Sequence, residues 1–191
     1  MPRTYAEGGE NGMQAIKFDK PAVQYTALPD PADFDTFVPF LKGVFSQWHF
    51  TPFNLDGQSF VAAEQWMMFA KALLFGDLEV ARQILASPDP STQKRLGQLV
   101  SGFEPEKWNE WKIDIVYRGN IAKFSQNPGA LRQLRNTGKA MLVEANPRDW
   151  IWGVGRGVDD PLGHSPKQWR GQNLLGLILT KVRDDLSAAP A

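Results

Sequence analysis

Residues 61–75 read VAAEQWMMFAKALLF, an uninterrupted run of good helix formers that Gly76 brings to a stop. The run predicts the clearest helix of the chain and points to a mainly helical protein. It is apolar nearly all round, and its polar residues are Glu64, Gln65 and Lys71. One segment therefore supplies both the fold class and the first candidates for a functional site.

Further helices are predicted downstream from apolar periodicity and from capping residues. They cover about 77–86, 91–100, 105–125, 128–137 and 171–186. Ser91 is expected to cap the third helix of the chain, and Asn127 the helix that starts with Pro128. Most of the chain from residue 61 onward is thus predicted to be helical.

Short strands are expected around the helices. The Asp-Gly pair at 56–57 signals a tight turn and predicts a hairpin over 50–61. Residues 40–50 suggest a short strand and a loop, 141–145 alternate as a strand, and 150–170 are expected to form an ordered loop. The predicted fold class is mainly α, an orthogonal helical bundle with a small β-sheet.

No linker or internal repeat divides the sequence, so residues 16–187 are expected to form a single domain. Residues 1–15 are rich in Gly and Glu and are predicted to be a disordered tail, and 188–191 a short flexible one. A chain of 191 residues is long enough to bury a sizeable core without disulfides.

The composition argues against several classes of protein. Lys plus Arg and Asp plus Glu both total 21, so a net charge of zero gives no general reason to bind nucleic acid or an anionic membrane. Cysteine is absent and the histidines are His49 and His164, so we expect no metal site and no disulfide framework. No stretch approaches the roughly 18 to 20 apolar residues of a membrane span, and no signal peptide is apparent, so a cytoplasmic protein is expected.

Glu64 and Lys71 lie about 20 degrees apart on a helical wheel, in a sector that they share with apolar residues. A rise of about 10.5 Å separates them, too far for an ordinary ion pair, so each needs another partner or a wet cleft. Both side chains could extend outward from the rim of the core. Alternatively they line one pocket, in which apolar surroundings raise the pKa of Glu64 and Lys71 lowers it.

Residues 144–157 form a second candidate region, because a strand end is followed by a tight turn, an acid, two tryptophans and alternating glycines. Glycine costs conformational entropy in a plain connection, so Gly153 and Gly155 suggest that the backbone approaches a ligand. An Ω-like loop without a ligand is the alternative. Asp149 could be a site acid, an N-cap or a structural partner of a neighbouring arginine.

Six of the seven tryptophans divide into two expected groups. Trp66 and Trp111 are predicted to pack in the core. The candidates to line a cleft are Trp48, Trp108, Trp152 and Trp169. At a cleft edge, the face of an indole offers a surface on which a base or ring can stack.

Several blocks of sequence carry a resemblance to a known family. They are 64–77 (EQWMMFAKALLFGD), 123–127 (KFSQN), 142–145 (LVEA), 152–155 (WGVG) and 173–176 (NLLG). In order and spacing they resemble the NADAR (NAD and ADP-ribose associated) family over about 45–186. Two positions depart from the family pattern: Gln65 stands where many members have His, and Gln47 where Asn is common.

This resemblance implies a mainly α domain that hydrolyses an N-glycosidic bond on a ribose phosphate or on ADP-ribose. Similar members cleave ribosylamino-pyrimidine intermediates of riboflavin biosynthesis or remove ADP-ribose from guanine in nucleic acid. It implies that the catalytic residues are Glu64, Asp149 and Trp108. The expected substrate-binding residues are Lys71, Trp48, Trp152, Gly153, Gly155 and Asn173. We expect no cofactor, and nucleic acid as a partner only if it is ADP-ribosylated.

Cleavage of a ribosyl C–N bond passes through an oxocarbenium-like state, so one carboxylate stabilises positive charge while another activates water. Our hypothesis gives these roles to Glu64 and Asp149, in either order. Trp108 or Trp152 then stacks on the ring, and Lys71 holds phosphate or ribose oxygens. The alternatives are a module that binds ADP-ribose or a nucleotide without hydrolysis, and a helical interaction protein with an exposed apolar patch.

Overall fold

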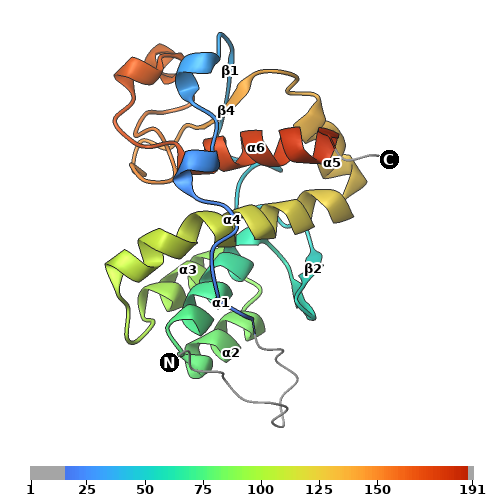
Figure 1. The fold of residues 1–191 in the computed structure, drawn as a ribbon, viewed down its shortest axis with the longest axis vertical. Coiled ribbons are helices and arrows are strands. Elements are labelled where there is room, and N and C mark those ends of the chain that lie inside the picture. The colour runs from blue at the N-terminus through green and yellow to red at the C-terminus, as the bar shows by residue number, and fades with distance from the viewer. Residues whose placement is uncertain (1–15, 189–191) are drawn as a thin grey trace.

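The computed structural model describes residues 16–188 (Figure 1). The α-helices are α1 (Ala63–Leu74), α2 (Leu78–Ala86), α3 (Pro90–Gln98), α4 (Pro105–Gln126), α5 (Pro128–Arg135) and α6 (Leu174–Ala188). The strands are β1 (Phe37–Phe40), β2 (Phe53–Leu55), β3 (Gln58–Phe60) and β4 (Met141–Glu144). Short 3-10 helices lie at Tyr25–Ala27, Pro31–Asp33, Pro161–His164 and Pro166–Gln168. The prediction of a mainly α fold with little β-structure is confirmed.

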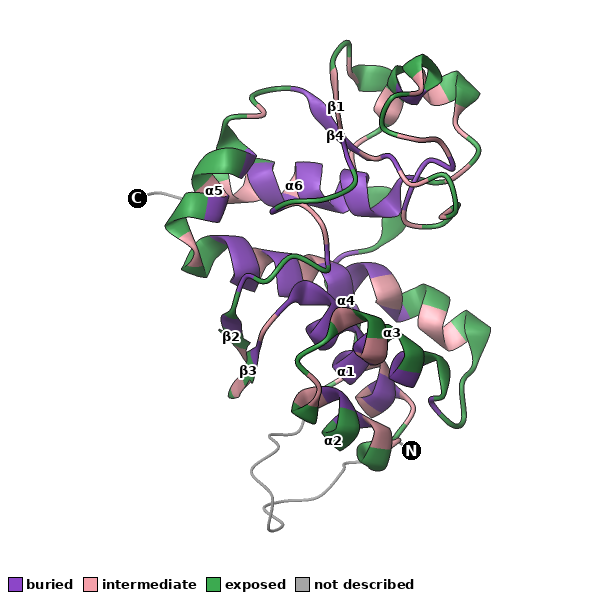
Figure 2. Ribbon diagram, turned by 180° about the vertical axis from the view of Figure 1, so that it is seen from behind, coloured by how far each residue is buried: buried purple, intermediate pink, exposed green. Residues whose placement is uncertain are grey.

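Helix α4 lies across the middle of the molecule and divides it into two parts (Figure 1). Helices α1, α2 and α3 pack together on one side of it, and α6 packs on the other side, against β4. Buried residues therefore run along α1, α4, α6 and β4 (Figure 2). Because α4 is covered on two sides, it carries apolar residues around much of its circumference.

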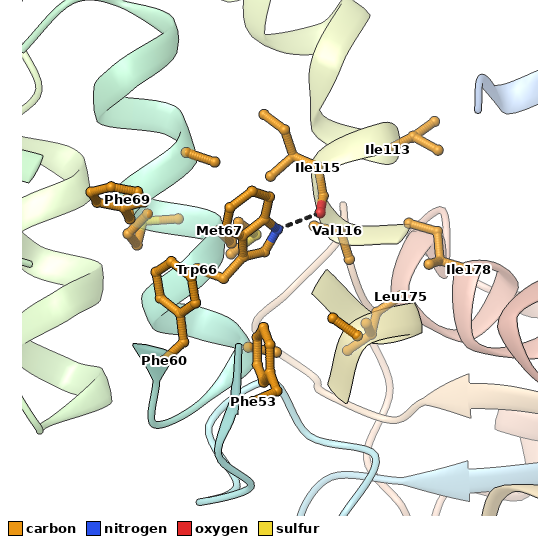
Figure 3. Packing of buried hydrophobic residues seen from close by; sticks show 14 of the residues in the cluster. Phe53, Phe60, Trp66, Met67, Phe69, Ile113, Ile115, Val116, Leu175 and Ile178 are labelled. Carbon is orange, nitrogen blue, oxygen red and sulfur yellow. Dashed lines mark hydrogen bonds between the residues drawn. The ribbon is translucent and has the colours of Figure 1, made fainter. Parts of the chain in front are cut away.

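Helix α1 is held in the core by Trp66, whose side chain is fully buried (Figure 3). Its indole Nε1 donates a hydrogen bond of 2.7 Å to the carbonyl oxygen of Ile115 in α4. Gly119 makes this crossing possible, because a Cβ at that position would stand 2.2 Å from the Trp66 ring. Trp66 and Trp111 are both buried, which confirms that they pack in the core.

The strands form two separate pairs. β1 and β4 are parallel, with Phe37 opposite Met141 and Phe40 opposite Glu144. β2 and β3 form the predicted hairpin, whose two-residue turn uses positive φ at Asp56 (50°) and Gly57 (75°). The strand expected within 40–50 lies earlier, at β1, and most of that segment is a loop.

Several predicted boundaries move for identifiable reasons. Helix α3 is capped by Asp89, whose carboxylate accepts from the amide of Thr92, so the prediction that Ser91 is the cap is wrong. Asn127 does precede α5, but its side chain donates to backbone carbonyls of the preceding segments instead of capping the helix. Helix α6 starts at Leu174, because Asn173 has a positive φ of 54° and is bonded to the loop at Gly153.

The predicted tail at 1–15 lies outside the described residues, as do 189–191, whereas Ala188 is the exposed last residue of α6. Within 16–188, no helix has both the length and the apolar character that crossing a bilayer requires.

Candidate functional site

Three carboxylates interact electrostatically where α1, β4 and the loop after β4 come together. Glu64 lies in the first turn of α1, Glu144 is the last residue of β4, and Asp149 follows in the loop. Burial raises the pKa of Glu64 to about 7, and the Asp149 carboxylate adds to this rise. Lys94 and a hydrogen bond from Trp48 oppose it. The predicted rise of the Glu64 pKa is thus present, but the opposing cation is Lys94 and not Lys71.

The pKa of Glu144 depends on burial and on charges of the same cluster. Burial raises its pKa to about 8, the charges of Asp149 and Glu64 raise it further, and Lys94 lowers it. Like charges close together disfavour the simultaneous ionisation of several carboxyl groups. Glu64 and Glu144 therefore both have pKa values near neutrality, which is a property of acid-base sites.

The segment before α1 holds Glu64 in place. Helix α1 has no side-chain cap at Ala62, and the amide of Glu64 donates instead to the carbonyl oxygen of Gln47 at 2.9 Å. The neighbouring Trp48 side chain donates to the Glu64 carboxylate. The Nζ of Lys94, on α3, lies 5.9 Å from the centre of the Trp48 ring. Gln47 and Trp48 thus connect the helix start to its nearby cation.

Lys123, on α4, also holds the segment before α1 in place. Its side chain is fully buried in α4, and its Nζ donates a hydrogen bond of 3.0 Å to the carbonyl oxygen of Ser46. Burial lowers the pKa of Lys123 to about 7. The lysine therefore fixes the turn that presents Gln47 and Trp48.

The backbone of Glu144 is fixed on both sides. Its amide donates to Oδ1 of Asn173 at 2.9 Å, and its carbonyl oxygen accepts from the amides of Asn146 and Val154, both at 3.0 Å. The Nδ2 of Asn173 donates to the carbonyl oxygen of Leu142 at 3.0 Å. Asn173 thus pairs with β4 as another strand would and places Glu144, while a role in substrate binding stays a prediction.

Asp149 organises the loop that follows. Its Oδ1 accepts hydrogen bonds from the amides of Ile151 (3.0 Å) and Trp152 (2.8 Å), which is the pattern of an Asx turn. Arg156, one of the proposed structural partners, pairs instead with Asp160 at 3.0 Å. Asp149 is therefore positioned by backbone amides, and it interacts with the other two acids.

Three buried polar atoms near these elements have no hydrogen-bond partner among the described residues: Gln47 Nε2, Asn120 Oδ1 and Glu144 Oε2. Asn120, fully buried in α4, donates from Nδ2 to Oε1 of Gln47 at 3.0 Å. The amide pair therefore keeps one free donor and one free acceptor. Buried polar atoms without partners are costly, so they are suited to binding a ligand.

Lys71 and Trp108 lie together near the other end of α1. The Nζ of Lys71 donates to the carbonyl oxygen of Gly97 at 2.7 Å and lies 4.5 Å and 5.6 Å from the ring centres of Phe103 and Trp108. Burial lowers the pKa of Lys71. These contacts explain why a lysine lies on an otherwise apolar helix. The roles of Lys71 and Trp108 with substrate stay predictions.

The glycines of the loop pack closely against other parts of the chain. A Cβ at Gly153 would stand 2.8 Å from the carbonyl oxygen of Glu144, and one at Gly155, where φ is 67°, would meet Trp150 and Arg170 at 2.9 Å. Trp152 is half-buried against the core. Contact between chain segments thus explains the glycines, and their contact with a ligand stays a prediction.

Sequence reasoning missed several residues of this cluster. Glu144 was assigned only to a strand end, because the alternation of β4 suggested one solvated face, whereas residues 141–143 are all buried. The signal in the sequence was a charged residue directly after a run of apolar residues. Asn120 and Lys123 are polar residues on a long helix, and only the packing of α4 on two sides reveals that they are buried. Gln65, although beside Glu64, donates to the carbonyls that end α2.

Two surface hollows lie elsewhere on the molecule. One of about 300 Å³ is lined by residues around Tyr25 and Glu110, and the other, of about 320 Å³, by residues around His49 and Asn127. Neither lining includes the three acids. The assignment of the site therefore depends on the coupled carboxylates and the free polar atoms, and not on the depth of a cavity.

Comparison with known proteins identifies the family of this chain. Residues 37–187 match the family model of the NADAR domain. The chain therefore belongs to the NADAR domain family.

Individual relatives carry more specific names. The chain is 42% identical over 147 residues to "N-glycosidase R617" of Acanthamoeba polyphaga mimivirus, which covers 74% of this chain and 86% of the relative. It is 31% identical over 118 residues to the "Riboflavin biosynthesis protein PYRR, chloroplastic" of Zea mays, which is 59% of this chain but 17% of the plant protein. The NMR structure of the E. coli protein YbiA superimposes with a TM-score of 0.67 at 26% identity, covering 81% of this chain and 86% of YbiA.

Proposed function

We propose that this protein is a hydrolase of N-glycosyl bonds that cleaves a ribose phosphate from a pyrimidine-type leaving group. The names of the mimivirus relative and of the E. coli relative, "N-glycosidase YbiA", support the reaction class. The name of the maize relative supports a link to riboflavin biosynthesis, and within that pathway we propose a ribosylamino-pyrimidine intermediate as the substrate.

The observation that carries the proposal is the cluster of Glu64, Glu144 and Asp149, whose charges are coupled. Hydrolysis of a ribosyl C–N bond needs a carboxylate that stabilises the oxocarbenium-like state and another that accepts a proton from water. Glu64 and Asp149 are suited to these two roles, because neighbouring donors hydrogen-bond to both carboxyl groups and hold them in place.

Substrate recognition is assigned to the groups around the acids. Gln47 Nε2 and Asn120 Oδ1 supply a buried donor and a buried acceptor for the substrate. The indole of Trp48 is 46% exposed beside Glu64 and offers a face on which the pyrimidine stacks. Lys94, next to that indole, is a cation suited to the phosphate.

A substrate panel tests this function. The protein is incubated with a ribosylamino-pyrimidine 5-phosphate, NAD, ADP-ribose and ADP-ribosylated guanine DNA, and the released sugar phosphate and base are measured. We expect turnover of the ribosylamino-pyrimidine, and its loss in Glu64→Gln. Preferred release of guanine would instead identify an ADP-ribosyl-guanine glycohydrolase. Tight calorimetric binding of ADP-ribose without any product would identify a binding module.

A further inference from the structure

Glu144 combines a rigid backbone with an unpaired carboxyl group. Its amide and carbonyl groups make three hydrogen bonds, to Asn173, Asn146 and Val154. Gly153 packs so closely on its carbonyl oxygen that a Cβ there would stand 2.8 Å away. By contrast, Oε2 is buried and has no hydrogen-bond partner among the described residues. The chain therefore fixes the backbone that carries this carboxyl group and leaves its Oε2 without a partner among the described residues.

The environment separates Glu144 from the other two acids. Asp149 accepts two backbone amide hydrogen bonds, and Glu64 accepts one from Trp48, all of which stabilise a carboxylate. Glu144 forms no ion pair with any described residue, and its carboxyl group stands in the field of two other acids, which Lys94 opposes only in part. A buried carboxyl group in such a field is most stable in its neutral form, as a proton donor.

We propose that Glu144 is the general acid that protonates the leaving-group nitrogen of the substrate, an assignment that rests on the proposed function. As the C1–N bond breaks, its electron pair stays on nitrogen, and the proton of the Glu144 carboxyl group moves to that nitrogen. Water adds its oxygen to C1 and gives a proton to Glu64 or Asp149. Exchange with solvent returns the proton to Glu144, so atoms and charges balance over one turnover. A third carboxyl group is needed because an amine is a poor leaving group unless it is protonated.

Leaving groups of different basicity test the assignment. Wild type and Glu144→Gln are assayed on a ribosylamino-pyrimidine 5-phosphate and on 4-nitrophenyl ribofuranoside 5-phosphate, whose nitrophenolate leaves without a proton. We expect Glu144→Gln to lose about 100-fold or more in kcat/KM on the amine substrate and less than about 3-fold on the aryl substrate. Glu64→Gln is expected to lose both activities, and the exposed Glu106→Gln neither.

The remaining outcomes are also decisive. Equal losses of Glu144→Gln on both substrates would overturn the assignment, whereas a wild type that cleaves neither substrate would overturn the proposed function. If wild type cleaves only the amine substrate, the pH dependence of kcat/KM decides. Glu144→Gln must lose the fall in rate at alkaline pH, and Glu144→Asp must still show such a fall. An unchanged alkaline limb in folded Glu144→Gln contradicts the assignment.

Discussion

Helix α1 carries one charged residue near each end, Glu64 and Lys71, on the same apolar sector. The surroundings of these two residues differ. Glu64, in the first turn, is 3% exposed and interacts electrostatically with Asp149 and Glu144. Lys71, in the last turn, is half-buried, donates to the carbonyl of Gly97 and lies over aromatic rings. A shared helical face therefore does not make a shared site. What differs is the packing: the first turn bonds to the loop at Gln47, whereas Lys71 in the last turn bonds to α3.

The largest expected effect compares Glu64→Gln with Lys71→Met. Removal of the Glu64 charge should lower kcat by about 1000-fold or more, because the charge acts in the transition state. Lys71→Met should leave kcat within about 3-fold and raise KM by about 10-fold at most, as expected for a residue that only binds. Steady-state kinetics on the amine substrate measure both. An equal collapse of kcat in Lys71→Met would mean that the two ends belong to one catalytic centre.

Gln47→Leu probes the loop that distinguishes the two ends. The side chain loses a buried donor, and Asn120 keeps its bond to the carbonyl of Val116, so the fold should tolerate the change. We expect KM to rise about 10-fold, because a hydrogen bond to substrate is worth roughly 1 to 2 kcal/mol. Gln65→Leu is unsuitable as a control, since Gln65 bonds to α2. The exposed Gln98→Leu serves instead. An unchanged KM would remove Gln47 from the substrate contacts.

Stability should depend on pH through the Glu64 end of α1. Burial raises the pKa from 4.5 to about 7 for Glu64 and to about 8 for Glu144, so the folded state binds more protons than the unfolded state between these limits. The contribution of these two carboxyl groups to the free energy of unfolding is therefore fully present below about pH 4.5 and is lost as pH rises through 7 and 8. Glu144→Gln should melt roughly 5 °C above wild type at about pH 9 and close to it at about pH 5. Calorimetry at both pH values checks this, and a parallel shift at both would contradict it.

The smallest expected effect concerns Lys94, the cation of the Glu64 end. Lys94 lowers the pKa of both Glu64 and Glu144, and its side chain is exposed. Lys94→Met should move both limbs of the pH–rate profile to higher pH by up to about one unit, and less at high salt. Lys139→Met, which removes another exposed lysine, should leave the profile unchanged. A profile that does not move with Lys94→Met would assign the balancing charge to another residue.

Much of the fold follows from local sequence. The Asp56-Gly57 turn and the helices at 63–74 and 105–126 agree with prediction, because turn chemistry and apolar periodicity act over a few residues. The cap of α3 was misassigned because Asp89 and Ser91 are both good caps, and only the position of Pro90 at the first helical turn separates them.

The candidate site was predictable only in part. Glu64 stood out because an acid on an apolar helix needs an explanation, and Asp149 because of its unusual loop. Glu144, by contrast, has an ordinary position at the end of a strand. Its importance arises from contacts with residues distant in sequence, such as Asn173.

By itself, the sequence determined the helical class, the hairpin, the family and two of the three coupled acids, because these depend on residue type and local spacing. The tertiary structure alone decided that Glu144 joins them, that Lys94 rather than Lys71 balances their charge, and that Asn173 and the loop glycines support β4. The physical reason is that burial and Coulomb interactions depend on distances through space, and β4, α1 and α3 meet only in the folded chain.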